Sequence, residues 1–149
     1  MRVRRGEARD VGTIVEFNEA MARETEGREL DKAVLTSGVE GLMIKPQYGF
    51  YLVALEGQER LVGSLLVTYE WSDWRNGLLW WIQSVYVRPD WRRRGVYRRL
   101  YQEVKDLAGR EPLVRGIRLY VEQDNATARG TYAALGMEQT PYRIFEELF

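Results

Sequence analysis

The sequence contains neither cysteine nor histidine. Without cysteine there is no disulfide framework, no thiol nucleophile and no thiolate metal site. Without histidine there is no Ser-His-Asp triad and no imidazole ligand or proton carrier. Acid–base chemistry in such a chain falls to carboxylates, tyrosine, lysine, a terminus or water. No run of Asp and Glu has the spacing of a metal-binding loop, so we expect no metal.

The sequence also lacks an excess of either charge, with 22 Lys and Arg against 22 Asp and Glu. Nucleic-acid-binding and membrane-surface proteins usually carry a basic excess, so neither partner is expected. The N-terminus, MRVRRGEARD, shows no signal peptide. No segment approaches the roughly 18 apolar residues of a membrane span. These absences predict a cytoplasmic protein.

The apolar content, 45% of 149 residues, is sufficient for the core of one domain spanning residues 1–149. Four segments have the periodicity of helices: residues 10–23, 31–44, 95–108 and 124–136. Six segments have the composition of strands: residues 2–5, 50–55, 60–69, 78–87, 116–121 and 142–149. Asp10 and Asp31 are expected N-caps, and Gly109 is expected just beyond the third helix. The order predicts an α/β (α+β) domain with a largely antiparallel sheet of about six to seven strands and about four helices.

The stretch WRRRGVYRRLY, residues 91–101, concentrates arginine between the strand at 78–87 and the following helix. A helix start carries partial positive charge and unpaired N–H groups, so each cation there costs about 0.3–1 kcal/mol at exposed sites. When a phosphate or pyrophosphate is bound there, the same cations become favourable, because the anion accepts hydrogen bonds from the backbone and from arginine. Gly95 lets the backbone approach such a ligand closely. The alternative is a solvated basic surface.

The loop RRRGVY, residues 92–97, resembles the pyrophosphate loop [QR]-x-x-G-x-[GA] of the GCN5-related N-acetyltransferases, with Tyr97 in place of the small last residue. Residues 125–137, NATARGTYAALGM, resemble that family's N-x-x-A-x-x-x-Y-x-x-L-G-F signature, with Met137 replacing Phe. Residues 3–14 look like its first strand and helix entry. The two motifs occur in the right order with a strand between them, and the resemblance covers essentially the whole chain.

The resemblance implies that the chain uses acetyl-CoA. It places the cofactor against the strand before the loop, the loop itself and the second motif: Val85, Tyr86, Val87, Arg92, Arg93, Arg94, Gly95, Val96, Tyr97, Arg98, Asn125 and Tyr132. The amide of Val87 or Val85 is the expected oxyanion donor. Tyr132 is the expected general acid for the leaving thiolate, against the alternative of a core tyrosine. For Asn125 the alternative is a helix cap.

The general base is open, because the chain offers only carboxylates acting directly or through water. Candidates are Glu24, Glu26 and Glu29 between the first two helices, and Glu70 and Asp73 near the end of the third strand. Each can instead be a solvated surface group. Trp71, Trp74, Trp80 and Trp81 lie near the same region, where they either wall an amine pocket or pack in the core or in a dimer interface.

The predicted function is N-acetyl transfer from acetyl-CoA to a primary amine on a small cationic molecule, by direct attack in a ternary complex. The segment WSDWRNGLLWWIQSVYV resembles that of small diamine-type acetyltransferases. A protein lysine or N-terminus is the alternative acceptor. A non-catalytic CoA or nucleotide sensor is the alternative outside this class. Exposed tryptophans, and the dimers common in the family that the chain resembles, predict a homodimer.

Overall fold

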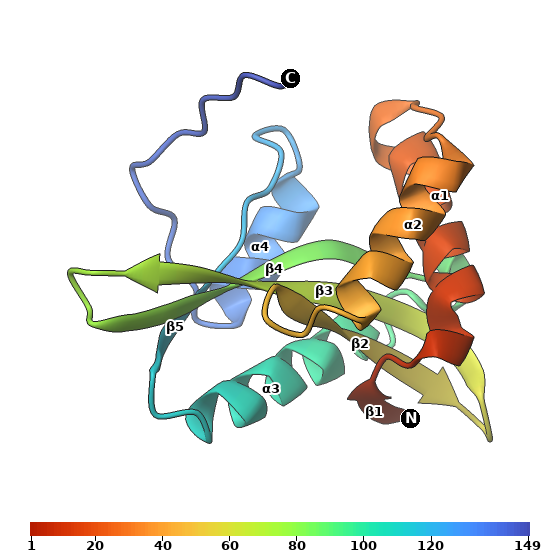
Figure 1. Ribbon diagram of the computed structural model, residues 1–149, viewed down its shortest axis with the longest axis horizontal. Coiled ribbons are helices and arrows are strands. Elements are labelled where there is room, and N and C mark those ends of the chain that lie inside the picture. Colours follow the sequence, from red (N-terminus) through yellow and green to blue (C-terminus); the bar gives the residue numbers. More distant parts are fainter. The chain divides into compact units, whose positions relative to one another are not determined.

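The computed structural model describes residues 1–149. The chain divides into two compact units, Met1–Leu119 and Tyr120–Phe149. The first unit holds a sheet with helices on both of its faces (Figure 1). No helix is long and apolar enough to cross a membrane. The fold class is as predicted: a mixed α/β protein with four α-helices and a mostly antiparallel sheet.

The sheet of the first unit has five strands in the order of the chain. They are β1 (Arg2–Arg5), β2 (Gly49–Glu56), β3 (Arg60–Ser72), β4 (Gly77–Val87) and β5 (Val114–Arg118). The pairings from β1 to β4 are antiparallel, and β5 joins β4 in parallel. Parallel strands require a crossover, and the third helix supplies it. The sheet thus has five strands, fewer than the six to seven that were predicted.

The helices of this unit are α1 (Val11–Glu26), α2 (Lys32–Met43) and α3 (Val96–Gly109). The first two lie on one face of the sheet and α3 lies on the other (Figure 1). Two short 3-10 turns occur in this unit: η1 (Ala8–Asp10) precedes α1, and η2 (Pro89–Trp91) precedes the arginine loop, residues 92–97. The core on the α1 face contains Ile14, Val15, Phe17, Val39, Tyr51, Val53, Leu55, Leu61 and Tyr86. This packing fixes α1 against β4 and so determines where the end of α1 lies.

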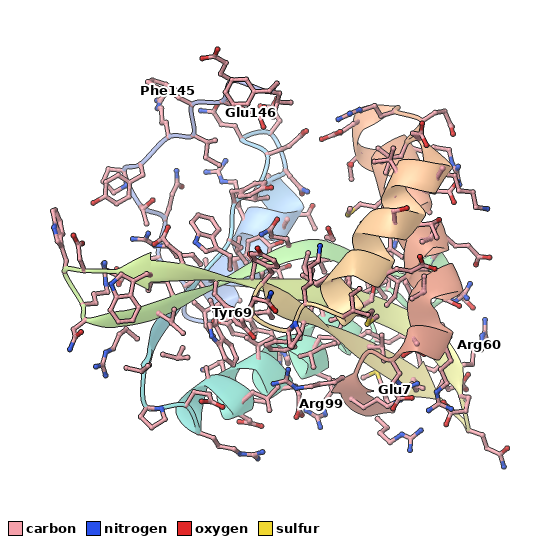
Figure 2. All side chains as sticks on the ribbon, in the orientation of Figure 1. Glu7, Arg60, Tyr69, Arg99, Phe145 and Glu146 are labelled. Carbon is pink, nitrogen blue, oxygen red and sulfur yellow. The ribbon has the colours of Figure 1, made fainter.

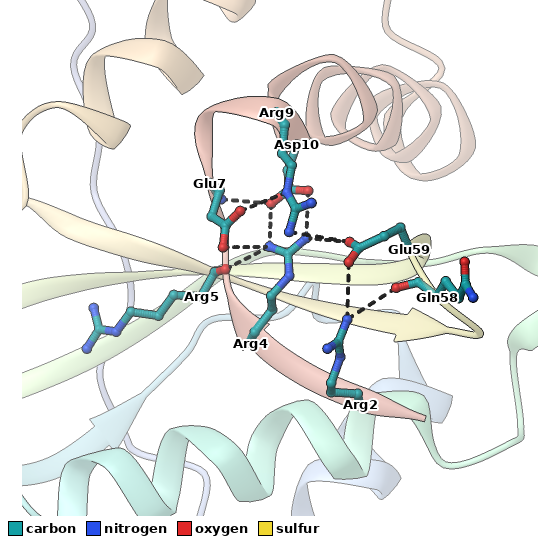
Figure 3. A network of polar contacts seen from close by, with 8 residues as sticks. All are labelled: Arg2, Arg4, Arg5, Glu7, Arg9, Asp10, Gln58 and Glu59. Carbon is teal, nitrogen blue, oxygen red and sulfur yellow. Dashed lines mark hydrogen bonds and ion pairs between the residues drawn. The ribbon is translucent and has the colours of Figure 1, made fainter.

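The two predicted N-caps behave differently. Asp31 caps α2 as expected, because its carboxylate accepts a hydrogen bond from the Val34 amide at 3.1 Å. Asp10 makes no side-chain cap to α1. Its carboxylate accepts from the Glu7 amide at 2.7 Å and from both terminal nitrogens of Arg4, at 2.7 and 3.1 Å (Figure 3). The competing ion pair takes the carboxylate away from the helix end.

Two other boundaries differ from the prediction. Gly109 is the last residue of α3 rather than the residue after it, and Arg110 follows in a right-handed conformation. The strand predicted over 116–121 begins and ends earlier, as β5. Both differences are shifts of a few residues at the ends of elements, where capping groups and strand neighbours decide the boundary.

The second unit contains one helix, α4 (Ala126–Ala134), which confirms the helix predicted over 124–136. Residues 142–149 form no strand, which corrects the predicted sixth strand. A strand requires a neighbour for its backbone N–H and C=O groups, and apolar alternation alone does not provide one. The segment instead exposes large side chains; Phe145, labelled in Figure 2 beside Glu146, is 97% exposed.

Candidate active site

A bulge separates the two halves of β4. Ser64 pairs with Tyr86, and Leu66 pairs with Gln83, so two residues of β4 face one residue of β3. Ser84, within the bulge, has a φ of 49°, a left-handed conformation that non-glycine residues adopt at a cost. Bulges bend a strand and end regular pairing, and they recur beside active sites.

Beyond the bulge, β4 has an open edge. Its parallel pairing with β5 runs only from Leu78 to Trp81. The Arg88 amide donates to the Val62 carbonyl of β3 at 2.9 Å. Because neighbouring residues of a strand direct their backbone groups to opposite edges, the N–H and C=O of Val87 face away from β3. An extended ligand chain can therefore pair with this part of β4 like an added strand.

The loop between η2 and α3 contains two left-handed residues, Arg93 with a φ of 61° and Gly95 with a φ of 79°. Gly95 is the N-cap residue of α3, and no side chain caps the helix there. A Cβ built on Gly95 meets no atom within 4 Å, so the space in front of this turn is open. Left-handed turns and an uncapped helix start both present backbone N–H groups to an anion.

Three arginines around this turn have no carboxylate partner. We call Arg93, Arg94 and Arg98 the loop arginines; all three are exposed, and none forms an ion pair. Arg94 lies over the ring of Trp91 at 5.3 Å. Arg99, by contrast, pairs with Glu103 one turn later at 3.1 Å. The loop arginines thus leave positive charge unbalanced at a helix start that is already positive.

Val96 and Tyr97 occupy the first two positions of α3. The Val96 side chain is buried, and the Tyr97 ring stacks on Tyr101 with centroids 6.2 Å apart. Both side chains are therefore directed into packing contacts. Their backbone amides belong to the first helical turn, where N–H groups lack partners within the helix. Tyr97 at the position of the small motif residue thus does not remove a donor from the turn.

Arg92, the first arginine of the loop motif, is placed differently from the loop arginines. Its Nη2 lies 2.6 Å from Oε2 of Glu24 in the last turn of α1, and its Nε donates to the Val87 carbonyl at 3.0 Å. The Tyr86 hydroxyl donates to Oε1 of the same carboxylate at 3.1 Å. The end of α1, the end of β4 and the loop therefore meet at one carboxylate.

Tyr86 itself lies in the core, with its ring 5.1 Å from that of Phe17. Burial raises the pKa of the Tyr86 hydroxyl, and the Glu24 carboxylate raises it further. Tyr86 is consequently a neutral donor at physiological pH. It acts here as an anchor for Glu24.

Three of the other carboxylates proposed as a base form ion pairs, whereas Asp73 forms none and accepts from the Trp74 amide at 2.8 Å. Glu29 lies 3.6 Å from Arg23. Glu26 lies 3.7 Å from Arg28, and Glu70 lies 3.2 Å from Arg118. The indole of Trp81 donates to Glu70 at 3.4 Å. Glu70 and Trp81 share one face of the sheet with Thr68 and Gln83, which are hydrogen-bonded to each other. Trp81 is thus the tryptophan that lies against a carboxylate.

The remaining tryptophans have other surroundings. Trp80 is buried on the opposite face and packs against Phe50 and Tyr69 at centroid distances of 5.3 and 5.9 Å. It is therefore a core residue. Trp71 and Trp74 are 56% and 86% exposed, near the β3–β4 turn.

In the second unit, Asn125 caps α4, since its side-chain oxygen accepts from the Ala128 amide at 3.0 Å. Tyr132 is half-buried and shares a stripe of the helix with Ala128 and Leu135. Burial raises the pKa of the Tyr132 hydroxyl above its ordinary value. The phenol is thus protonated throughout the neutral range.

Two features of the site were not found from the sequence. The bulge at Ser84 had a signal, since Gln83 and Ser84 interrupt an otherwise apolar strand. The contacts of Glu24 with Tyr86 and Arg92 had none, because they join residues more than sixty positions apart.

The chain matches the acetyltransferase (GNAT) family over residues 14–137. A possible acetyltransferase from Clostridium difficile 630 is similar, with 40% identity, a TM-score of 0.91, and coverage of 99% of this chain and 97% of that one. A predicted acetyltransferase from Clostridium acetobutylicum, solved with acetyl-CoA, has 16% identity and a TM-score of 0.79 over 98% and 95% of the two chains.

An aminoglycoside 6'-N-acetyltransferase from Acinetobacter haemolyticus has 15% identity and a TM-score of 0.77, covering 100% of this chain and 99% of that one. At these low identities the last two structures establish a shared fold. A search of curated proteins finds no match. The family match includes β4, the arginine loop, α3 and α4, and the chain therefore belongs to the acetyltransferase (GNAT) family and is an acyltransferase.

Proposed function

We propose that the protein transfers an acetyl group from acetyl-CoA to a primary amine on a small cationic molecule. The observation that carries this proposal is the α3 turn, where the loop arginines have no carboxylate partner and the space before Gly95 is open. A diphosphate is the anion that such a turn accommodates, through backbone N–H groups and charge-assisted bonds from arginine.

The open edge of β4 supports the remainder of the cofactor site. Val85, Tyr86 and Val87 lie on the part of the strand that β5 does not pair. The outward N–H of Val87 is available to the amides of a pantetheine arm, and its C=O, which accepts from the Nε of Arg92 at 3.0 Å, becomes available when that contact is released. The amide of Val87 or Val85 donates to the thioester carbonyl, which stabilises the negative charge that develops on its oxygen during attack.

The acceptor must arrive as a neutral amine or lose a proton in the site. Glu24, Glu26 and Glu70 are the base candidates, and all three are ion-paired carboxylates at least two-fifths exposed. Carboxylates of this kind attract a cationic acceptor and exchange an arginine for an ammonium at little cost. The resemblance of residues 71–87 to diamine-type acetyltransferases favours the same small cationic class.

Tyr132 donates the proton to the departing thiolate. Burial raises the pKa of its hydroxyl, so the phenol carries its proton at neutral pH and can donate it. The chain has no cysteine, so the acetyl group passes directly to the amine rather than through a cysteine-linked acyl-enzyme. The family match continues from the first unit into the second, which supports one catalytic domain over residues 1–149.

Replacing Tyr132 tests the proposal. In a thiol-release assay against polyamine, amino-acid and peptide panels, Tyr132→Phe is expected to lower kcat by about tenfold or more while the Kd for CoA stays unchanged. Tyr142→Phe, an exposed tyrosine of the same unit, is the matched control and is expected to retain activity. Binding of CoA without turnover of any amine by the wild-type protein would instead indicate a sensor. The homodimer stays a prediction, supported by the exposed Trp71 and Trp74.

A further inference from the structure

The ion pair between Glu24 and Arg92 links one of the base candidates to the proposed cofactor loop. Glu24 belongs to the end of α1, whereas Arg92 begins the loop that is proposed to hold the diphosphate. The pair is the direct side-chain link from α1 to this loop. The pair therefore restrains Arg92, whereas the loop arginines contact no carboxylate and are not restrained in this way.

One edge of the Arg92 guanidinium is fully engaged. Its Nε donates to the Val87 carbonyl at 3.0 Å, and its Nη2 donates to Glu24 at 2.6 Å. A guanidinium binds a phosphate in a bidentate manner, through two neighbouring N–H donors. The Nε and Nη2 groups of Arg92 are one such pair of donors. The same contact covers the outward carbonyl of Val87, which the pantetheine arm requires. Arg92 thus competes with the pantetheine arm for the Val87 carbonyl. Its contact with Glu24 also keeps this pair of donors from the diphosphate.

The pair is weak enough to exchange. The side chains of Arg92 and Glu24 are 45% and 41% exposed, and exposed ion pairs contribute little net stability. A diphosphate at the positive start of α3 offers Arg92 more charge than one carboxylate does. Glu24 meanwhile keeps its second anchor, because Oε1 still accepts from the Tyr86 hydroxyl.

We propose that Glu24 is a positioning residue that holds Arg92 off the cofactor site and releases it when the diphosphate binds. Release frees Oε2 of a carboxylate whose other oxygen remains fixed by Tyr86. Cofactor binding thereby exposes an anchored negative charge at the end of α1, which favours subsequent binding of a cationic amine. This inference rests on the proposed function, because it assumes that the loop binds the diphosphate of CoA.

Titration calorimetry with CoA tests the inference. Glu24→Gln removes the competitor for Arg92, and it is expected to bind CoA about two- to fivefold more tightly than wild type. The gain should persist with 3'-dephospho-CoA, which retains the diphosphate alone. A purely structural role for Glu24 predicts the opposite sign, because loss of a supporting contact weakens a binding site.

Three variants complete the test. Glu19→Gln is the matched control, since Glu19 also lies on α1 and pairs with a cation, Lys32 at 3.8 Å, away from the loop. It should leave the CoA affinity unchanged. Glu24→Asp keeps the charge but withdraws the carboxylate, and it should also tighten binding. In an Arg92→Gln background, Glu24→Gln should have no effect.

The outcomes separate the inference from the proposed function. If wild-type protein binds CoA and Glu24→Gln does not bind it more tightly, the inference is wrong and the function stands. An equal gain in Glu19→Gln also overturns it, because that result is a general effect of net charge. If wild-type protein binds no CoA, the proposed function fails.

Discussion

Two arginine-rich regions of the chain are used in opposite ways. The N-terminal arginine cluster, Arg2, Arg4 and Arg9, is surrounded by the carboxylates of Glu7, Asp10 and Glu59 (Figure 3). The loop arginines, Arg93, Arg94 and Arg98, have no carboxylate within ion-pairing distance. The first region is balanced within the folded chain, whereas the second is left with a positive charge that only an external anion balances.

The difference extends to burial. Asp10 is 3% exposed, and Arg4 is closely held by it and by Glu59, which lies 3.3 Å away. This pair joins β1 to the start of α1 and is part of the structure's stability. The loop arginines are exposed and contribute no comparable contact. Substitutions in the two regions should therefore affect different measurements.

The largest expected effect is on cofactor binding. Replacing all three loop arginines by glutamine should weaken CoA binding by about 100-fold or more, because several charge-assisted bonds to phosphate are lost. The free energy of unfolding should stay the same or rise slightly. Calorimetry and urea unfolding measure the two quantities. An unchanged Kd would show that the comparison is wrong and that these arginines are a solvated surface.

The opposite pattern is expected for the N-terminal arginine cluster. Asp10→Asn leaves Arg4 without its buried partner and should lower the free energy of unfolding by about 2–3 kcal/mol, with CoA affinity unchanged. Burial alone would raise the pKa of Asp10, but hydrogen bonds from Arg4 and the Glu7 amide outweigh it and lower the pKa.

The lowered pKa gives this prediction a pH dependence. A carboxyl group whose folded-state pKa is depressed stabilises the fold above its unfolded pKa and loses that contribution as the pH falls below about 4. Wild-type protein should therefore lose stability in this range, and the loss should be smaller in Asp10→Asn. Urea unfolding at pH 7 and at pH 3.5 measures the difference. If the free energy of unfolding fell equally in both proteins between pH 7 and pH 3.5, Asp10 would not contribute to the loss of stability in acid.

The smallest effect tests the cost of charge at the start of α3. Arg98→Glu places an anion in the first helical turn and should raise the free energy of unfolding by about 0.3–1 kcal/mol in low salt. Arg9→Glu, in the balanced cluster, should lower it instead, because Arg9 lies 2.7 Å from Glu7. If both changes had the same sign, the two regions would not differ electrostatically.

Local patterns predicted most of the fold. The periodicity of residues 10–23 and 31–44 located α1 and α2, and the doubly apolar run at 78–87 located β4, because burial on one or both faces leaves its mark in neighbouring residues. The strand predicted over residues 142–149 was wrong, because a strand needs a neighbouring strand, and the alternation of apolar and polar residues does not provide one. The N-cap predicted at Asp10 was wrong because Arg4 binds its carboxylate instead.

The candidate site divides in the same way. The arginine loop and the uncapped start of α3 were predictable, since they lie within one short stretch of sequence. The ion pair of Glu24 with Arg92 was not, because it exists only after α1 packs against β4. The pairing of Glu70 with Arg118 was not predictable either, because it depends on β3 and β5 lying on the two sides of β4.

The contact of Arg94 with the indole of Trp91 has a practical consequence. A guanidinium above an indole alters its emission, and Arg94 is one of the groups that a diphosphate would draw away. Trp91 is the last residue of η2, just before the loop arginines, and its emission is expected to report binding of a ligand to the turn. A chain in which the other four tryptophans are replaced by phenylalanine would allow ligand arrival to be followed without an added dye.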